Sequence, residues 1–374
     1  MNRFIPVNEP LLNGNEKKYL NECIDTGWIS SEGRFIKKLE EDFSTYCHQK
    51  YGITVANGSV ALDVAVRALK EKHNWQDNDE IIVPTFTLIS SAQSVIYNKL
   101  KPIFVDCESV TWNMDTSKIE PAITTRTKAI MVVHIYGLPT DMQPIFDLAK
   151  KYDLKIIEDS AQAHGQTYFN KKCGGMGDIS TFSFYANKHI AAGEGGMILT
   201  SDKDLFEKCN YFKNLCFQPE QRYVHNDLGW NFRMSNIQAA VGVAQFERLE
   251  QSIKIKKQMG KKYRELLSQI PAQLPMPKMD YAENHYWVFG IVLNDDVKFN
   301  AQVAREKLQQ NGVGTRPFFY PMHQQPVLIR LKLSDKEYRP VSERLYDRGF
   351  YIPSGLGLDD EQIEKVVKEI RRLF

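Results

Sequence analysis

The sequence lacks the cysteine patterns of disulfide-rich and zinc-binding proteins. It contains six cysteines, and no two of them form a CxxC pair. In a chain of this length, such wide spacing predicts reduced thiols in a cytosol and excludes a disulfide framework or a zinc site. The cysteines are Cys23, Cys47, Cys107, Cys173, Cys209 and Cys216.

Long apolar runs are also missing. The N-terminal stretch MNRFIPVNEPLLNGNEKKYL has no apolar core of the length that a signal peptide needs. A run of about 18 apolar residues, the length that spans a bilayer, occurs nowhere in the chain. We therefore expect a cytoplasmic protein without a membrane partner.

Charge of one sign is not in excess. The chain carries 48 Lys and Arg residues against 46 Asp and Glu residues, a formal net charge of +2. This balance gives no long-range field that would attract nucleic acid, so we expect no nucleic-acid partner. The eight histidines are scattered without an HExxH pair, and no metal site is predicted.

What the sequence does contain is a regular alternation of strands and helices. The chain has 374 residues, which is long enough for two domains. Between Tyr51 and Thr200, apolar runs such as YGITVA, DEIIVP and LKIIED alternate with helical patterns. This alternation predicts an α/β fold with a mostly parallel central sheet and helices on both faces.

The texture changes after Met234. Residues 234–267 read as one long helix, with Ser235 and Asn236 as capping candidates, and a proline-rich stretch follows. The remaining residues predict a smaller α/β unit. We therefore expect a large domain over residues 1–245 and a small C-terminal domain over residues 246–374.

The sequence NGSVAL follows a predicted strand and opens a helix. The backbone N–H groups of Gly58 and Ser59 would then point outward from a helix N-terminus, which suits a phosphate group. An ordinary helix cap explains the same residues, because Asn and Ser are preferred at that position.

The sequence LKIIEDSAQAHG ends an apolar strand in two carboxylates, Glu158 and Asp159. A carboxylate at the end of a strand often serves only as a cap or an ion-pair partner. The functional interpretation is that Asp159 faces a cationic ring nitrogen while Gln162 donates a hydrogen bond to a neighbouring oxygen.

The sequence FSFYANKHIAAGEGGM places Lys188 between an aromatic run and a glycine cluster. Such surroundings predict desolvation, which lowers the pKa of an amine. A neutral amine is the nucleophile that Schiff-base chemistry requires. The glycines would allow a bulky planar ligand to approach the backbone closely.

These three sites complement one another. A phosphate anchor, a carboxylate for a ring nitrogen and a lysine for an aldehyde are together what pyridoxal 5'-phosphate requires. The sequence therefore predicts an enzyme that uses this cofactor.

The chain resembles the DegT/DnrJ/EryC1/StrS family of sugar aminotransferases over almost its whole length. The motifs that carry the resemblance include TGWISSEGRFIKKLEEDF, VPTFT, EDSAQAHG, GDISTFSFYANKHIAAGEGGM, GWNFRMSNIQAAVG and TRPFFYPMH. The resemblance implies the fold of aspartate aminotransferase, which is fold type I of the pyridoxal-phosphate-dependent transferases.

The resemblance also implies residue roles at the cofactor. Lys188 would form the Schiff base and carry the proton between cofactor and sugar, Asp159 would pair with the pyridine nitrogen, and Gln162 would bond the ring hydroxyl. Gly58, Ser59 and Ser183 would hold the phosphate. Asn231 would reach the phosphate of the neighbouring subunit, so the enzyme would be a homodimer with shared active sites.

The resemblance also bears on the face of the cofactor and on the substrate. Many relatives have an aromatic residue that stacks on the cofactor ring where this chain has Leu88, which would cover the ring by dispersion instead. His134 is either a substrate contact or a structural histidine at a strand end. Residues that fall in segments resembling the sugar and nucleotide contacts of relatives are Trp28, Ser30, Arg222, Tyr320 and His323.

The expected reaction moves an amino group from L-glutamate to C4 of a nucleotide-linked 4-keto-6-deoxyhexose, in the synthesis of surface polysaccharide such as O-antigen. The resemblance implies a GDP-linked sugar, with a dTDP- or UDP-linked sugar and amination at C3 as the alternatives. A sugar dehydratase of this family would carry histidine in place of Lys188, and a non-catalytic regulator is a further alternative.

Overall fold

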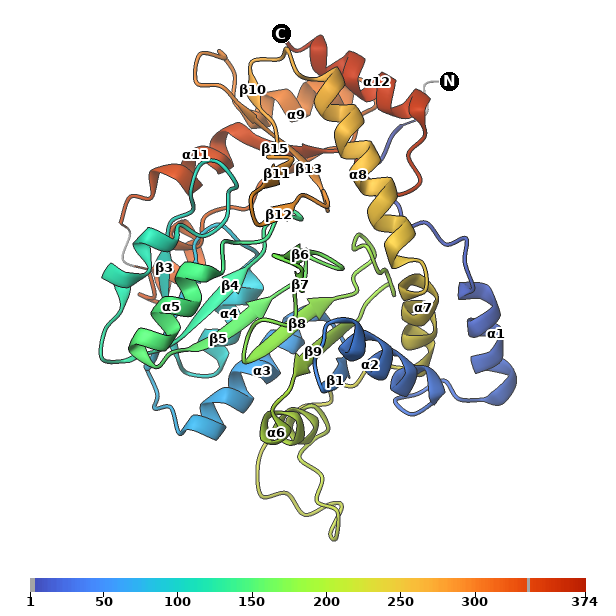
Figure 1. The fold of residues 1–374 in the computed structure, drawn as a ribbon, viewed down its shortest axis with the longest axis vertical. Helices are drawn as coiled ribbons and strands as arrows, with labels where there is room; N and C mark the ends of the chain where they lie inside the picture. The colour runs from blue at the N-terminus through green and yellow to red at the C-terminus, as the bar shows by residue number, and fades with distance from the viewer. Residues whose placement is uncertain (1–3, 335–336) are drawn as a thin grey trace.

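The computed structural model describes residues 4–334 and 337–374. A seven-stranded sheet lies at its centre, with the strand order β1-β9-β8-β5-β4-β2-β3 (Figure 1). β9 runs antiparallel to both of its neighbours, and the other strands are parallel to one another. The strands are β1 (Tyr51–Val55), β2 (Glu80–Pro84), β3 (Lys101–Val105), β4 (Thr127–Val133), β5 (Lys155–Asp159), β8 (Ile179–Ser183) and β9 (Gly196–Thr200). The predicted α/β fold with a mostly parallel sheet is confirmed.

Helices cover both faces of this sheet, which explains why its strands are mostly buried and carry apolar residues on both faces. In β4, Ala129 and Met131 pack into one core and Ile130 and Val132 into another, because alternate side chains point to opposite faces. The first core contains residues of α3 (Gly58–His73), α4 (Ile89–Tyr97) and α6 (Lys203–Lys213). The opposite face packs against α2 (Arg34–Tyr46), α5 (Gln143–Tyr152) and α7 (Asn236–Phe246).

The single long helix predicted over residues 234–267 is wrong. The structure has two helices here, α7 and α8 (Leu249–Leu266), separated at Glu247 and Arg248. Glu and Arg are both good helix formers, so intrinsic propensity gives no sign of this break. The predicted start is confirmed, because Ser235 forms a capping box with Gln238.

A smaller C-terminal unit lies beyond α8 and has its own core (Figure 1). Its four-stranded antiparallel sheet has the order β10-β13-β15-β14. The strands are β10 (Ala272–Gln273), β13 (Phe289–Leu293), β14 (Arg316–Pro317) and β15 (Gly349–Ile352), and the helices are α9 (Ala301–Gln310), α11 (Pro340–Arg348) and α12 (Asp360–Arg371). Ile5 also packs into this core and pairs with Val313, so the start of the chain contacts the small unit. The domain boundary near residue 245 stays a prediction.

The remaining elements are short or peripheral. They are α1 (Glu16–Thr26), η1 (Thr116–Lys118), η2 (Glu120–Ala122), β6 (Thr167–Tyr168), β7 (Lys171–Lys172), β11 (Lys278–Met279), β12 (Ala282–Glu283), η3 (Met322–Gln324) and α10 (Pro326–Arg330).

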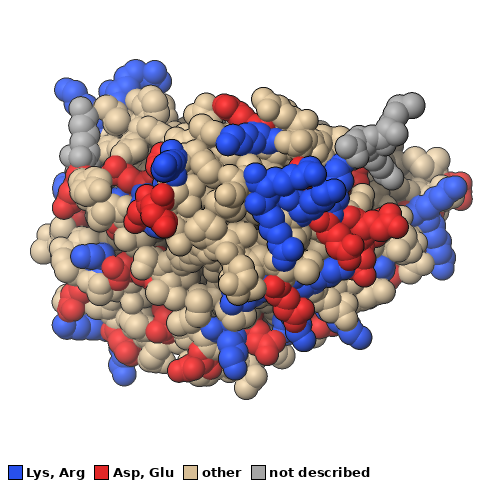
Figure 2. Space-filling model, turned by 90° about the horizontal axis from the view of Figure 1, so that it is seen from above, with Lys and Arg blue, Asp and Glu red and all other residues tan. Residues whose placement is uncertain are grey.

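The surface and the cysteines agree with the composition. Basic and acidic side chains are interspersed over the face seen from above (Figure 2). All six cysteines are buried and free of disulfides. Within residues 4–334 and 337–374, no helix combines the length and the apolar character that crossing a membrane requires.

Candidate active site

The carboxyl ends of β1 and β8 and the amino end of the antiparallel strand β9 bring the predicted phosphate residues together. Gly196 pairs with Val55 at the end of β1 and with Ser183 at the end of β8. A Cβ atom on Gly196 would lie 2.6 Å from the carbonyl oxygen of Asn57, and one on Gly58 would lie 2.6 Å from Cβ of Ser183. Only glycine at these two positions allows the turn before α3 to lie directly against Ser183.

The N-terminus of α3 is capped, which changes one predicted contact. Oδ1 of Asn57 accepts hydrogen bonds from the N–H groups of Ser59 (3.0 Å) and Val60 (3.1 Å). The prediction that the Ser59 N–H points outward is therefore wrong. The groups that remain for a phosphate are the Gly58 N–H and the hydroxyls of Ser59 and Ser183, at the positive end of a 16-residue helix.

Asp159 is the last residue of β5, and its carboxylate is buried. One oxygen accepts the N–H of Ala161 at 3.1 Å, and the other lies 3.4 Å from the hydroxyl of Ser91. Burial raises the pKa of Asp159, while the Ala161 N–H and the charge of Lys188 act in the opposite direction. A cationic ligand nitrogen beside this carboxylate would stabilise its charged form, which burial destabilises.

Lys188 lies in the turn that follows β8. Its N–H donates to the Tyr185 carbonyl at 2.9 Å, and the returning chain passes Gly195 at a φ of 149°. The side chain of Lys188 is partly exposed to solvent, although its amine is desolvated by the surrounding protein. Burial lowers the pKa of Lys188 to about 7, and Asp159 opposes this shift. Near neutral pH, a large fraction of this amine is thus in the nucleophilic form.

Gln162 and Leu88 occupy positions that suit their predicted roles. Oε1 of Gln162 accepts the N–H of Tyr136 at 2.8 Å, which fixes the side-chain amide and leaves Nε2 as the donor for a ligand. Leu88 precedes α4 and is 53% exposed, as a residue that covers a ligand face would be before binding.

His134 belongs to the support of the site. Its Nε2 donates to Glu158 at 3.0 Å, and its Nδ1 accepts the N–H of Thr140 at 3.2 Å. Both ring nitrogens are used, so the structural interpretation of His134 holds.

Glu158, His134 and Cys173 also place potential metal ligands within 4.8 Å of one another. Burial raises the pKa of the Cys173 thiol well above its usual value, and Glu158 already accepts several N–H and O–H donors. A protonated thiol and a saturated carboxylate are poor metal ligands. This cluster is therefore not assigned to a metal.

The predicted substrate contacts are not gathered in one place within this chain. Asn236 donates to the backbone carbonyls of Trp28 (2.7 Å) and Ser30 and thereby holds this segment. The side chains of Trp28 and Ser30 are exposed. Arg222 stacks over Phe217, 4.8 Å from the ring centre, in the exposed loop that projects beyond α6 (Figure 1).

Two further predicted substrate contacts, Tyr320 and His323, lie in the segment before α10. Tyr320 is partly buried against Tyr346. His323 is 1% exposed, with Nδ1 2.7 Å from the Thr85 hydroxyl and Nε2 3.0 Å from Glu343. Those two bonds leave His323 no free polar atom, so its predicted substrate contact is not supported.

Asn231 lies at the end of the same projecting loop, and its side chain is exposed. The next residue, Phe232, accepts the N–H of Ala56 at 2.8 Å. The loop is thus anchored beside the phosphate turn of its own chain. The predicted reach of Asn231 into a partner's site stays a prediction.

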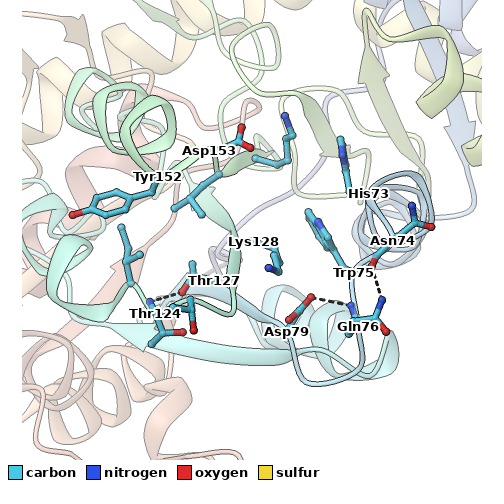
Figure 3. A pocket seen from close by; sticks show the side chains of 14 residues that line it. His73, Asn74, Trp75, Gln76, Asp79, Thr124, Thr127, Lys128, Tyr152 and Asp153 are labelled. Atoms are coloured by element: carbon cyan, nitrogen blue, oxygen red, sulfur yellow. Dashed lines mark hydrogen bonds between the residues drawn. The ribbon is translucent and has the colours of Figure 1, made fainter.

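A cavity of about 840 Å³ opens at the opposite edge of the sheet (Figure 3). It is lined by residues such as Trp75, Thr127, Lys128 and Lys155, at the amino ends of β2, β4 and β5. Ligands of parallel sheets bind at the carboxyl ends of the strands. We therefore place the active site at Lys188 and Asp159 and not in this cavity.

Sequence analysis missed two residues of the site. Ser91 contacts Asp159 from α4, and Trp287 lies against Lys188 from the small unit. Ser91 lies within the predicted ligand edge and could have been suspected from its place after VPTFT. Trp287 stands in an ordinary apolar stretch, so no local signal marks it.

The fold and the site together define an aminotransferase of the pyridoxal-phosphate-dependent class. The chain belongs to the DegT/DnrJ/EryC1/StrS aminotransferase family, which matches residues 10–371. It is 40% identical to GDP-perosamine synthase of Escherichia coli O157:H7, over 100% of this chain and 99% of that protein. It is 38% identical to GDP-perosamine synthase of Vibrio cholerae, over 99% of each chain.

The fold is also that of a solved relative. Helicobacter pylori PseC, an aminotransferase involved in the biosynthesis of pseudoaminic acid, superimposes with a TM-score of 0.93 at 23% identity, covering 100% of this chain and 99% of that one. The predicted fold type, enzyme class and family are confirmed.

The residues present fit pyridoxal phosphate. The buried carboxylate of Asp159 has no cationic partner within ion-pair distance among the described residues, and a protonated ring nitrogen would complete it. The turn at Gly58 and Ser183 is too tight for a side chain and offers an N–H and two hydroxyls to a phosphate. Lys188 supplies an amine with a lowered pKa. The cofactor, when bound, would act as the electron sink.

Proposed function

We propose that this enzyme transfers an amino group from L-glutamate to C4 of a GDP-linked 4-keto-6-deoxyhexose. The observation that carries the proposal is full-length similarity, at 38% and 40% identity, to two proteins named GDP-perosamine synthase, combined with Lys188 beside Asp159. Similarity over the whole chain includes the segments around Trp28, Arg222 and Tyr320, where a nucleotide sugar would bind.

The residues of the chain then have distinct tasks. Gly58, Ser59 and Ser183 would hold the phosphate, and Asp159 would keep the ring nitrogen protonated. Gln162 would orient the ring, and Leu88 would cover its face. Lys188, when free, would hold and move the proton at sugar C4, because its lowered pKa allows it to accept and release a proton near neutral pH.

Amination of a dTDP- or UDP-linked sugar, amination at C3, and dehydration are the competing reactions. Lys188 disfavours dehydration, because the family's dehydratases carry histidine at that position. The experiment is a panel of GDP-, dTDP- and UDP-linked keto sugars, each incubated with glutamate and the enzyme and analysed by mass spectrometry. We expect an aminated product only from the GDP-linked 4-keto-6-deoxy sugar, and none with Lys188→Ala. Amination of another nucleotide sugar in preference would overturn the GDP assignment.

We further propose a cytoplasmic homodimer with shared sites that acts in O-antigen synthesis. The loop before Asn231 exposes Tyr223 (81%) and Leu228 (89%), apolar side chains of the kind found in interfaces. Mixing inactive Lys188→Ala chains with inactive Asn231→Trp chains tests the sharing. Random exchange should restore about a quarter of wild-type activity, since half the dimers would contain one intact site. No recovery after proven exchange would mean that Asn231 serves the site of its own chain.

A further inference from the structure

The amine of Lys188 lies over an aromatic ring from the small unit. Nζ of Lys188 is 3.7 Å from the ring centre of Trp287, which is 5% exposed. A cation this close to the face of an indole is attracted by the ring quadrupole, and the attraction grows when water is excluded. Trp is the strongest of the aromatic partners for this contact.

The Trp287 ring is fixed from both its side chain and its backbone. Its indole N–H donates to the carbonyl of Asn187 at 2.9 Å, one residue before Lys188. Its own carbonyl accepts from Nζ of the buried Lys256 at 2.8 Å, and Lys256 also binds the carbonyl of Ser354. The ring therefore cannot turn away from Lys188 without breaking the partly buried hydrogen bond to Asn187.

A glycine brings the large domain against this tryptophan. Gly137 has a φ of 103°, and a Cβ atom there would lie 2.6 Å from the backbone nitrogen of Trp287. Any other residue at Gly137 would be strained and would push the ring away. The contact between Trp287 and Lys188 thus rests on several independent restraints.

We propose that Trp287 is a positioning residue that holds the free amine of Lys188 and stabilises its protonated form. Burial alone favours the neutral amine, which binds an aldehyde but cannot keep a proton taken from substrate. The ring face counteracts burial without introducing a second negative charge beside Asp159. Near neutral pH the free amine is then divided between the neutral form, which attacks an aldehyde, and the protonated form, which carries a proton taken from substrate.

Several other titratable groups lie near Lys188. Asp159 faces it from the end of β5, and His164 and His189 lie close by. Burial lowers the pKa of His164 to about 3 and that of His189 well below its usual value, so both rings stay neutral across the range that matters. Burial likewise lowers the pKa of His285 to about 3. Burial lowers the pKa of Lys256 on α8 to about 7, so Lys256 titrates in the same range as Lys188.

The test measures the pKa of the two lysines directly. The full-length protein is freed of cofactor, labelled with 15N at its lysines and titrated between pH 5 and 10, and the Nζ chemical shifts of Lys188 and Lys256 are followed by NMR. We expect the apparent pKa of Lys188 to fall by about 0.4–1.5 units in Trp287→Leu, because a cation–π contact of this kind is lost. Trp287→Phe, which keeps a weaker π face, should fall between Trp287→Leu and wild type.

Two controls separate this effect from general loosening. Trp112 is a buried tryptophan of the same aromatic cluster, so Trp112→Leu should leave the pKa of Lys188 unchanged. Lys256 bonds the main-chain carbonyls of Trp287 and Ser354 and not the indole ring, so its apparent pKa should not follow that of Lys188. An unchanged or raised pKa of Lys188 in Trp287→Leu, or equal shifts of both lysines, would overturn the proposal. The readout needs no substrate, so it is independent of the sugar specificity proposed above.

Discussion

Replacing Glu158 with glutamine should destabilise the large domain strongly, although the two side chains have the same shape. Glu158 is fully buried one residue before Asp159. Its Oε1 accepts from Nε2 of His134 (3.0 Å), the Ser160 hydroxyl (3.1 Å) and the Gly174 N–H (2.5 Å). Burial raises the pKa of this carboxyl, but these donors outweigh burial and the net pKa is lowered.

The magnitude follows from counting the donors that would lose their acceptor. Oε2 accepts the N–H groups of Met176 (2.9 Å) and Gly177 (3.0 Å) and the Ser180 hydroxyl (3.1 Å). An NH₂ group in place of either oxygen faces two N–H donors that cannot turn around, whereas the serine hydroxyls can. Each unpaired buried donor costs about 1–3 kcal/mol, so the loss is about 2–6 kcal/mol. For a domain of this size that corresponds to a fall in Tm on the order of 4–12 °C.

The assay is thermal unfolding monitored by circular dichroism, with Glu247→Gln as the matched control. Glu247 accepts from Asn15 and Tyr19 at an exposed site, so its replacement should leave Tm unchanged. The difference in Tm between wild type and Glu158→Gln should also become smaller as the pH falls below about 4. A carboxyl with a lowered pKa stabilises the fold only while it is charged. A Tm no lower than that of the control, or a difference that persists in acid, would refute the donor count.

Three further predictions concern the lysines and the ring carboxylate. Lys188→Ala should fold with an unchanged Tm yet lose transamination by several orders of magnitude, since nucleophile and proton carrier are the same amine; activity within tenfold of wild type in a coupled glutamate assay would contradict this. Asp159→Asn should retain bound cofactor, measured by its absorbance, but lose most turnover, because an amide cannot hold the ring nitrogen protonated; a nearly unchanged rate would make Asp159 structural. Lys256 has a folded pKa near 7 against 10.5 unfolded, so the unfolded chain binds more protons between those values and stability should rise with pH. Compared with Lys256→Met, the wild type should gain about 1 kcal/mol per pH unit from pH 7 to 9 in chemical denaturation; parallel curves would show that Lys256 stays charged when folded.

Much of the fold could be predicted because its information is local. The strands of the central sheet are short apolar runs, and the alternation of core faces in β4 appears directly in the sequence as adjacent apolar residues. The cap at Ser235 could be predicted for the same reason, since the residues that make it lie within three positions. The break between α7 and α8 could not, because Glu247 and Arg248 favour a helix.

The candidate site could be predicted where each residue stands at a strand end. Asp159 and Ser183 are the last residues of their strands and the turn at Gly58 follows another, and the topology of a parallel sheet brings such ends to one edge. The state of each group was harder to predict. The sequence predicts that the Ser59 N–H is available to a phosphate. In the structure this N–H donates to the side-chain oxygen of Asn57, which lies only two residues earlier in the chain.

Residues whose role depends on distant packing had no signal in the sequence. His323 stands in an aromatic, histidine-containing stretch that resembles a substrate segment, yet Thr85 and Glu343 occupy both its nitrogens. Trp287 shows the opposite case, because it lies in the bend just before β13 of the small unit and contacts Lys188 there. The two residues are separated by 99 positions, and α8 with Lys256 lies between them. The chemistry of Lys188 therefore depends on how the small unit packs on the large one.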